Sequence, residues 1–229
     1  MNGKVVITEG IIGVGKTTFS ECLSRHLEAY WMKEPDETNG NPYLSMFYNN
    51  QTRWAFTMQL HLLNTRYRMH QNAQWMALQQ KSNVVLDRSY FGDTAFARLQ
   101  KKMGTMTTDE FETYALCYQN MTSTILLPHI CVHLVVSPTI AQQRVKKRME
   151  KQTGRVCENV IDIKYLTDLQ TEESHMISQL EAQGVKVISL NWNENMTIEE
   201  IDTKAREVAL DICSHKPPNF FIDLHRRTM

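Results

Sequence analysis

The sequence predicts an α/β fold in which helices cover both faces of a five-stranded parallel sheet. Short apolar runs alternate with longer stretches whose apolar residues recur at helical spacing, as in strand–helix–strand units. A glycine-rich segment separates the first apolar run from the first helical stretch, and charged residues follow the second and third runs. Ligands of such sheets bind beyond the carboxyl ends of the strands, so we expect the functional residues there.

The apolar runs and the periodic stretches between them give the expected elements in order. The expected strands cover residues 4–8, 29–33, 83–86, 130–136 and 185–190. The expected helices cover residues 18–29, 51–80, 107–126, 138–151, 163–183 and 197–214, with a short amphipathic piece at 44–48. We expect one domain over residues 1–214 and a C-terminal tail at 215–229.

Composition narrows the class of protein. The 229 residues are 42% hydrophobic, which is enough for a real core. Lys plus Arg and Asp plus Glu number 25 each, so no overall charge favours nucleic acid or a membrane as a partner. The five cysteines are scattered without metal-binding spacing, and no apolar run could span a bilayer. We therefore expect a cytoplasmic protein with reduced thiols.

The glycine-rich segment after the first strand matches G-x-x-x-x-G-K-[ST], the P-loop pattern. Glycines allow the backbone N–H groups to wrap a polyphosphate, and the helix start adds a partial positive charge. Lys16 supplies a cation for the outer phosphates, and the Thr17 hydroxyl suits Mg²⁺. The predicted phosphate-binding residues are Gly10, Gly13, Gly15, Lys16, Thr17 and Thr18.

Two charged motifs stand at expected strand ends. Glu34, fixed by Pro35, could accept a proton from an attacking hydroxyl, or could be an ordinary solvated acid. Asp87 follows the third apolar run, where a carboxylate partner of Mg²⁺ is expected beside a P-loop. Arg88 next to it could hold a phosphate oxygen, whereas the plain alternative is a surface Asp–Arg pair.

A third candidate is the basic stretch over residues 143–158. Its cations are Arg144, Lys146, Lys147, Arg148, Lys151 and Arg155. Such a run is most often a solvated helix face, and sometimes a nucleic-acid patch. Because it follows the fourth strand, it could instead close over a nucleotide and neutralise charge on a transferred phosphoryl group.

Together these motifs resemble those of the deoxyribonucleoside kinase family, which includes the deoxycytidine, deoxyguanosine, deoxyadenosine and mitochondrial thymidine kinases. The resemblance runs from the P-loop to about residue 212. It implies a P-loop kinase fold with a basic lid, ATP with Mg²⁺ as phosphoryl donor, and a homodimer. It further implies phosphorylation of the 5′-hydroxyl of a deoxynucleoside in nucleotide salvage, with Glu34 as the general base.

The resemblance also implies roles for substrate-binding residues. Tyr48 would contact the 3′-hydroxyl, and Gln59 would pair with the edge of the base. Arg66 and Asp93 would read the base together, and Glu158 at the end of the lid would bind the 3′-hydroxyl. The implied substrate-binding residues are Glu34, Tyr48, Gln59, Arg66, Arg88, Asp93, Arg155 and Glu158. Lid arginines Arg144 and Arg148 would bind the nucleotide.

Some positions depart from the family pattern or bear on the base. The lid is about four residues longer than usual, through Met149 to Thr153. Phe47 and Leu62 would line the base pocket, so their bulk would affect which base fits. The segment 41–43 is similar to that of the bacterial purine-preferring branch, which favours a deoxyadenosine or deoxyguanosine substrate.

Two other functions compete with this interpretation. The first is a thymidylate-type kinase acting on a nucleoside monophosphate, whose Glu-Pro motif normally stands between arginine and glycine rather than Lys33 and Asp36. A monophosphate acceptor would also need further cationic ligands. The second is a nucleotide-binding protein without transferase activity, which would have no need of Glu34 on the acceptor side.

Overall fold

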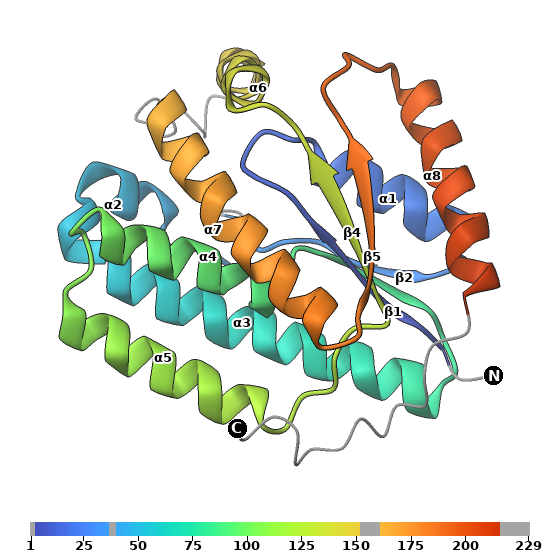
Figure 1. Cartoon of the computed structure of the whole chain (residues 1–229), viewed down its shortest axis with the longest axis horizontal. Helices are drawn as coiled ribbons and strands as arrows, with labels where there is room; N and C mark the ends of the chain where they lie inside the picture. Colours follow the sequence, from blue (N-terminus) through green and yellow to red (C-terminus); the bar gives the residue numbers. More distant parts are fainter. Residues whose placement is uncertain (1–2, 37–39, 152–160, 216–229) are drawn as a thin grey trace.

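The computed structural model describes residues 3–36, 40–151 and 161–215. Five parallel strands form one sheet in the order β2-β3-β1-β4-β5 (Figure 1). The strands are β1 (Val5–Glu9), β2 (Tyr30–Met32), β3 (Val84–Asp87), β4 (Ile130–Val135) and β5 (Lys186–Asn191). Each of the five expected strands is confirmed, and no strand end differs by more than one residue from its expected position.

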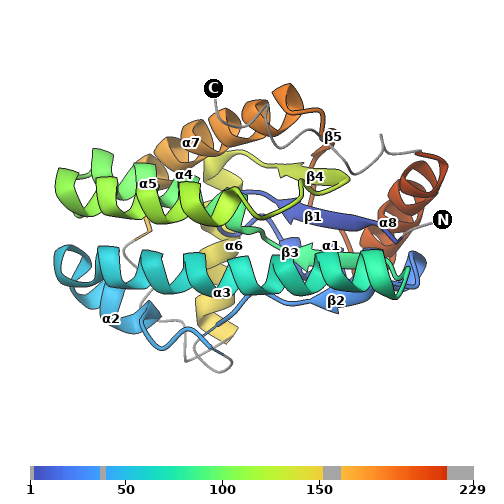
Figure 2. The same ribbon diagram turned by 90° about the horizontal axis from the view of Figure 1, so that it is seen from below.

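Helices cover both faces of the sheet, as expected. They are α1 (Lys16–His26), α2 (Leu44–Asn49), α3 (Gln51–Gln79), α4 (Tyr90–Lys102), α5 (Thr108–Thr122), α6 (Pro138–Lys151), α7 (Ile163–Ala182) and α8 (Ile198–Ser214). Helices α1 and α8 pack together on one side of the sheet, and α3, α4, α5 and α7 lie on the other (Figure 1). The long helix α3 runs almost the full length of the molecule (Figure 2).

The central strands β1, β3 and β4 are largely apolar on both faces because both faces are covered. In β1, Val6 packs into the cluster formed with Phe19 and Leu23 of α1. Its neighbours Val5 and Ile7 point to the opposite face and pack against α3, α4 and α7. All three β1 residues are at most 1% exposed. A continuous apolar run of this kind is what a doubly covered parallel sheet requires.

Helix α4 is an element that the sequence periodicity did not predict. Nine of its 13 residues are buried, and the polar Asp93, Thr94 and Gln100 are among them, so the apolar pattern of its buried side is interrupted. Its end signals were nevertheless present in the sequence. The Ser89 hydroxyl accepts a hydrogen bond from Gly92 N at the start of the helix, and Lys101 and Lys102 occupy its last turn.

The strand order brings the three predicted motifs to one edge of the sheet. Strand β1 lies between β3 and β4, and β3 pairs with β2 on its other side. The carboxyl ends of β1, β2 and β3 therefore deliver the P-loop, Glu34 and Asp87 to neighbouring positions. Among the described residues, no helix is both long and apolar enough to cross a membrane.

Candidate active site

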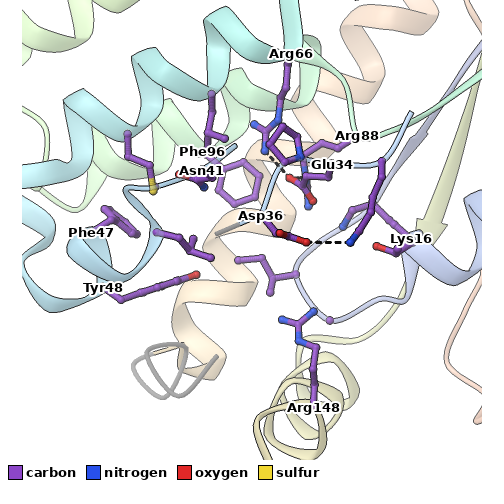
Figure 3. A pocket seen from close by; sticks show the side chains of 18 of the residues that line it. Lys16, Glu34, Asp36, Asn41, Phe47, Tyr48, Arg66, Arg88, Phe96 and Arg148 are labelled. Atoms are coloured by element: carbon purple, nitrogen blue, oxygen red, sulfur yellow. Dashed lines mark hydrogen bonds and ion pairs between the residues drawn. The ribbon is translucent and has the colours of Figure 1, made fainter. Parts of the chain in front are cut away.

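A cavity of about 490 Å³ opens at the carboxyl ends of these strands. Its size is typical of a site for a small organic ligand. Figure 3 shows charged side chains at one end of this cavity, and Phe47 and Tyr48 from α2 at the other. The lining residues that the sequence predicted are Gly13, Gly15, Lys16, Thr17, Thr18, Glu34, Phe47, Tyr48, Gln59, Leu62, Arg66, Arg88, Arg144 and Arg148. Most of the predicted site therefore surrounds one cavity.

The P-loop requires glycine at Gly10 and Gly13. Both have positive φ values, 154° and 85° respectively, which L side chains rarely adopt. A methyl group on Gly13 would also lie 2.5 Å from the carbonyl oxygen of Ala141, and one on Gly10 would lie 2.8 Å from that of Leu134. At both glycines, the neighbouring backbone therefore lies too close for any side chain to fit.

Lys16 lies at the base of this loop. Its ammonium group donates hydrogen bonds to the carbonyl oxygens of Gly10 at 2.7 Å and Ile11 at 3.1 Å. Burial, together with the nearby Arg88, lowers the pKa of Lys16 to about 8. The side chain is therefore still mostly a cation at neutral pH, in the position where the outer phosphates of a nucleotide are expected.

Glu34 is held by two arginines from different parts of the chain. Its Oε1 lies 2.5 Å from Arg66 Nη2 and 2.9 Å from Arg88 Nε. Burial alone would raise the pKa of this carboxyl, but Arg88, Arg66 and Lys16 outweigh it and lower the pKa to about 2. The side chain remains 29% exposed, so the ionised carboxylate faces the cavity.

Arg88 is buried at the centre of the charged end of the cavity. Its φ of 69° turns the chain sharply after β3. The guanidinium group lies between Glu34 and Glu9, whose Oε2 is 3.7 Å away, and donates to the carbonyl oxygen of Gly10 at 3.2 Å. Although burial would lower its pKa, these carboxylates raise it, so Arg88 is a permanent cation. It also lies 4.8 Å from the ring centroid of Phe96.

Glu9, whose role the sequence did not reveal, anchors this arginine segment. It is fully buried, and its Oε1 accepts hydrogen bonds from Ser89 N at 2.8 Å and Ser89 Oγ at 2.5 Å. Burial raises the pKa of Glu9, while Arg88 and Ser89 oppose that rise. A carboxylate ending an apolar strand immediately before the P-loop was the available signal.

The base-reading residues predicted from the resemblance lie together, although one does not line the cavity. Arg66 Nη1 binds Asp93 Oδ1, and Gln59 Nε2 donates to the Asp93 carbonyl oxygen at 3.1 Å. Arg66 and Gln59 line the cavity, whereas Asp93 is 0% exposed and lies behind them. The Tyr114 hydroxyl, which the sequence did not single out, donates to Asp93 Oδ2 at 2.7 Å.

The basic segment reaches the cavity through two of its arginines. Arg144 donates to the carbonyl oxygens of Val14 at 3.1 Å and Glu194 at 2.7 Å, and burial lowers its pKa. Arg148 points from α6 toward the cavity (Figure 3). The predicted lid residues Arg155 and Glu158, like residues 152–153 of the extended lid, lie outside the described residues.

Asp87 meets the requirements for a ligand of Mg²⁺. It is 1% exposed, and the Thr17 hydroxyl lies beside it as a hydrogen-bond donor. Burial and Glu34 raise its pKa, while Lys16 and the Thr17 hydroxyl oppose that rise. A buried acid beside the hydroxyl of the exposed Thr17 suits a hard cation shared with phosphates.

Comparison with known proteins identifies the family. A family model described as deoxynucleoside kinase matches residues 6–212. The chain belongs to the deoxynucleoside kinase family. It is 34% identical over 203 residues to a deoxyguanosine kinase of Dictyostelium discoideum, which covers 87% of this chain and 69% of that protein. It is 27% identical over 212 residues to a deoxyadenosine/deoxycytidine kinase of Bacillus subtilis (strain 168), covering 90% and 94% respectively.

A solved structure shares the fold of this kinase. The deoxyadenosine kinase from M. mycoides, solved with the products dCMP and dCDP, superposes with a TM-score of 0.75. The alignment covers 92% of this chain and all of that one, at 24% identity. The P-loop kinase fold predicted from the sequence is therefore confirmed, and this chain is a phosphotransferase that acts on deoxynucleosides.

Proposed function

We propose that this kinase transfers the γ-phosphoryl group of ATP to the 5′-hydroxyl of a purine deoxynucleoside. The observation that carries the proposal is that the Glu34 carboxylate and the Lys16 ammonium line the same cavity. A nucleoside bound between them would have its 5′-hydroxyl beside the carboxylate. That hydroxyl would point at the γ-phosphate of a nucleotide bound to the P-loop.

Glu34 would orient the attacking hydroxyl. Because its pKa is about 2, it is ionised at every pH at which the enzyme would work. It can therefore accept a hydrogen bond from the 5′-hydroxyl and then take its proton as the bond to phosphorus forms. The 29% exposure of its side chain leaves room for that contact.

The cations around Glu34 would stabilise the charge that spreads over the transferred group. Lys16 and Arg88 are buried and fixed, so they need little reorganisation during the reaction. Arg144 and Arg148 would add charge from the lid side. Asp87 and Thr17 would hold Mg²⁺, which neutralises phosphate charge when it is bound.

The other end of the cavity would select the sugar and the base. Tyr48 and Glu158 would hold the 3′-hydroxyl, while Gln59 and Arg66 would contact the base edge, since an amide can donate and accept at once. Arg155 would belong to the same closing segment. We propose a purine base because segment 41–43 is similar to that of the purine-preferring branch, and because two relatives are named deoxyguanosine kinase and deoxyadenosine kinase.

Further features are proposed for the whole protein. We infer one catalytic domain over residues 1–214 with residues 215–229 as a tail, and the family match to residue 212 supports that division. A homodimer, a role in nucleotide salvage and a cytoplasmic location are proposed from the family resemblance. The free cysteines among the described residues are Cys22, Cys117, Cys131 and Cys213, as a reducing compartment would keep them.

The test is a panel of kcat/KM values with ATP and Mg²⁺ for the four natural deoxynucleosides and their 5′-monophosphates. We expect deoxyadenosine or deoxyguanosine to give the highest value and the monophosphates to be poor acceptors. A monophosphate as best acceptor would favour the thymidylate-type alternative instead. ATP binding without transfer to any acceptor would leave only a nucleotide-binding protein.

A further inference from the structure

Tyr114 is a buried polar group that the mechanism above does not use. It lies on α5, is 2% exposed, and points its hydroxyl at a carboxylate of the neighbouring helix α4. That carboxylate belongs to Asp93, whose Oδ2 accepts the bond at 2.7 Å. The opposite oxygen of Asp93 accepts from Arg66, and the same guanidinium group reaches Glu34 through Nη2 at 2.5 Å. One line of contacts thus joins α5 to the cavity.

We propose that Tyr114 is a positioning residue that keeps Arg66 available to the substrate by supplying the second donor that Asp93 needs. The proposal rests on the function proposed above and adds a specificity-determining residue to it. Tyr114 does not line the cavity, so it would act only through Asp93 and Arg66.

The hydrogen-bonding capacity of the two groups explains how this works. Asp93 is fully buried, so both of its oxygens need donors from the protein. Tyr114 supplies one, and Arg66 therefore uses only Nη1 for Asp93 and keeps Nη2 at the cavity. Without the hydroxyl, the second oxygen of Asp93 would lose its donor and would draw both terminal nitrogens of Arg66, in the bidentate geometry that Arg and carboxylates favour.

The pKa shifts of Asp93 and Tyr114 agree with Tyr114 as the donor and Asp93 as the acceptor of their hydrogen bond. Burial raises the pKa of Asp93, while Arg66, Tyr114 and Gln59 oppose that rise. Burial also raises the pKa of Tyr114 well above its usual value, with Asp93 and the nearby Tyr118 adding to the effect. The phenol therefore stays protonated and remains a donor at neutral pH.

Tyr114→Phe is the direct test, because it removes the donor and keeps the ring that packs near Phe111. We expect the KM of the preferred deoxynucleoside to rise about tenfold or more, since a charged acceptor loses a buried partner. The ratio of kcat/KM between deoxynucleosides should change, while the KM of ATP should not. Tyr118→Phe, one turn further along α5, is the matched control and should leave every constant unchanged.

An unchanged deoxynucleoside KM in Tyr114→Phe, or an equal loss for ATP and for every deoxynucleoside, would overturn the proposal. Asp93→Asn provides the second arm. If Tyr114 acts through Asp93, adding Tyr114→Phe to Asp93→Asn should raise the KM no further, and a full additional rise would refute that route. This double variant also leaves no buried carboxylate without a donor, so it serves if the single variant does not fold.

An activity assay of the wild-type enzyme distinguishes a wrong role for Tyr114 from a wrong proposed function. If the wild type phosphorylates no deoxynucleoside, the function itself is wrong. If the wild type is active and Tyr114→Phe behaves like Tyr118→Phe, only the role of Tyr114 is refuted.

Discussion

Gly92, in the first turn of α4, is a position where one methyl group should disturb the active site. A methyl group there would lie 2.5 Å from Glu9 Oε2 and 2.8 Å from Glu9 Oε1. Real side-chain carbons do not approach so closely, so one partner must move. Glu9 cannot turn aside easily, because it is fully buried and its Oε1 accepts two hydrogen bonds from Ser89.

Two opposing effects set the magnitude for Gly92→Ala. Alanine favours a helix over glycine by about 1 kcal/mol. Overpacking costs about 1–3 kcal/mol, and breaking the buried Glu9 hydrogen bonds costs about 1–3 kcal/mol more. The net loss in the free energy of unfolding is therefore about 3 kcal/mol, which lowers Tm by about 6–12 °C in a protein of this size. The kcat should fall as well, because Ser89 adjoins Arg88.

Thermal unfolding followed by circular dichroism measures the stability, with initial rates at saturating substrates as the second readout. Gly104→Ala is the control, since no described atom lies within 4 Å of a methyl group there and only its φ of 72° is unfavourable. It should lose about 1 kcal/mol and keep its activity. Adding Glu9→Ala should remove most of the extra cost of Gly92→Ala. A Gly92→Ala protein as stable and as active as the wild type would refute this reasoning.

Two further predictions concern protons and metal. His129 Nδ1 accepts a hydrogen bond from Val5 N, and burial lowers the pKa of His129 from 6.5 to about 4. Between these pH values the unfolded chain binds more protons, so the free energy of unfolding should fall by up to ~3 kcal/mol from pH 7 to 4. His129→Asn keeps an acceptor, and urea titrations should show a smaller fall; an equal fall would contradict this origin. Asp87→Asn should raise the half-saturating Mg²⁺ concentration about tenfold or more without weakening deoxynucleoside binding measured calorimetrically; an unchanged Mg²⁺ requirement would exclude Asp87 as a ligand.

The sequence predicted the strands and the motifs well because both depend on local patterns. Residues 5–7 are apolar because both faces of the sheet are covered, and the P-loop spacing follows from its glycine geometry. The acids at Glu34 and Asp87 could be placed at strand ends before their neighbours were known. Their closeness at one edge of the sheet then follows from the parallel arrangement of β1, β2 and β3.

The contacts between distant side chains could not be predicted in the same way. Nothing local indicates that Tyr114 of α5 reaches Asp93 of α4, or that Arg66 divides its donors between Asp93 and Glu34. Helix α4 was missed because polar residues such as Asp93 and Gln100 lie on its buried side and interrupt the apolar pattern. The strand order β2-β3-β1-β4-β5 likewise depends on packing rather than on any single segment.

The central claim is that the Glu34 carboxylate prepares the 5′-hydroxyl for attack, and Glu34→Gln tests it most directly. The variant keeps the size of the side chain and an oxygen acceptor but cannot take a proton. Steady-state rates with ATP and Mg²⁺, paired with calorimetric binding of the deoxynucleoside, separate catalysis from binding. We predict that kcat falls about 10²–10⁴-fold while deoxynucleoside affinity changes far less. Turnover equal to that of the wild type would contradict the role of Glu34.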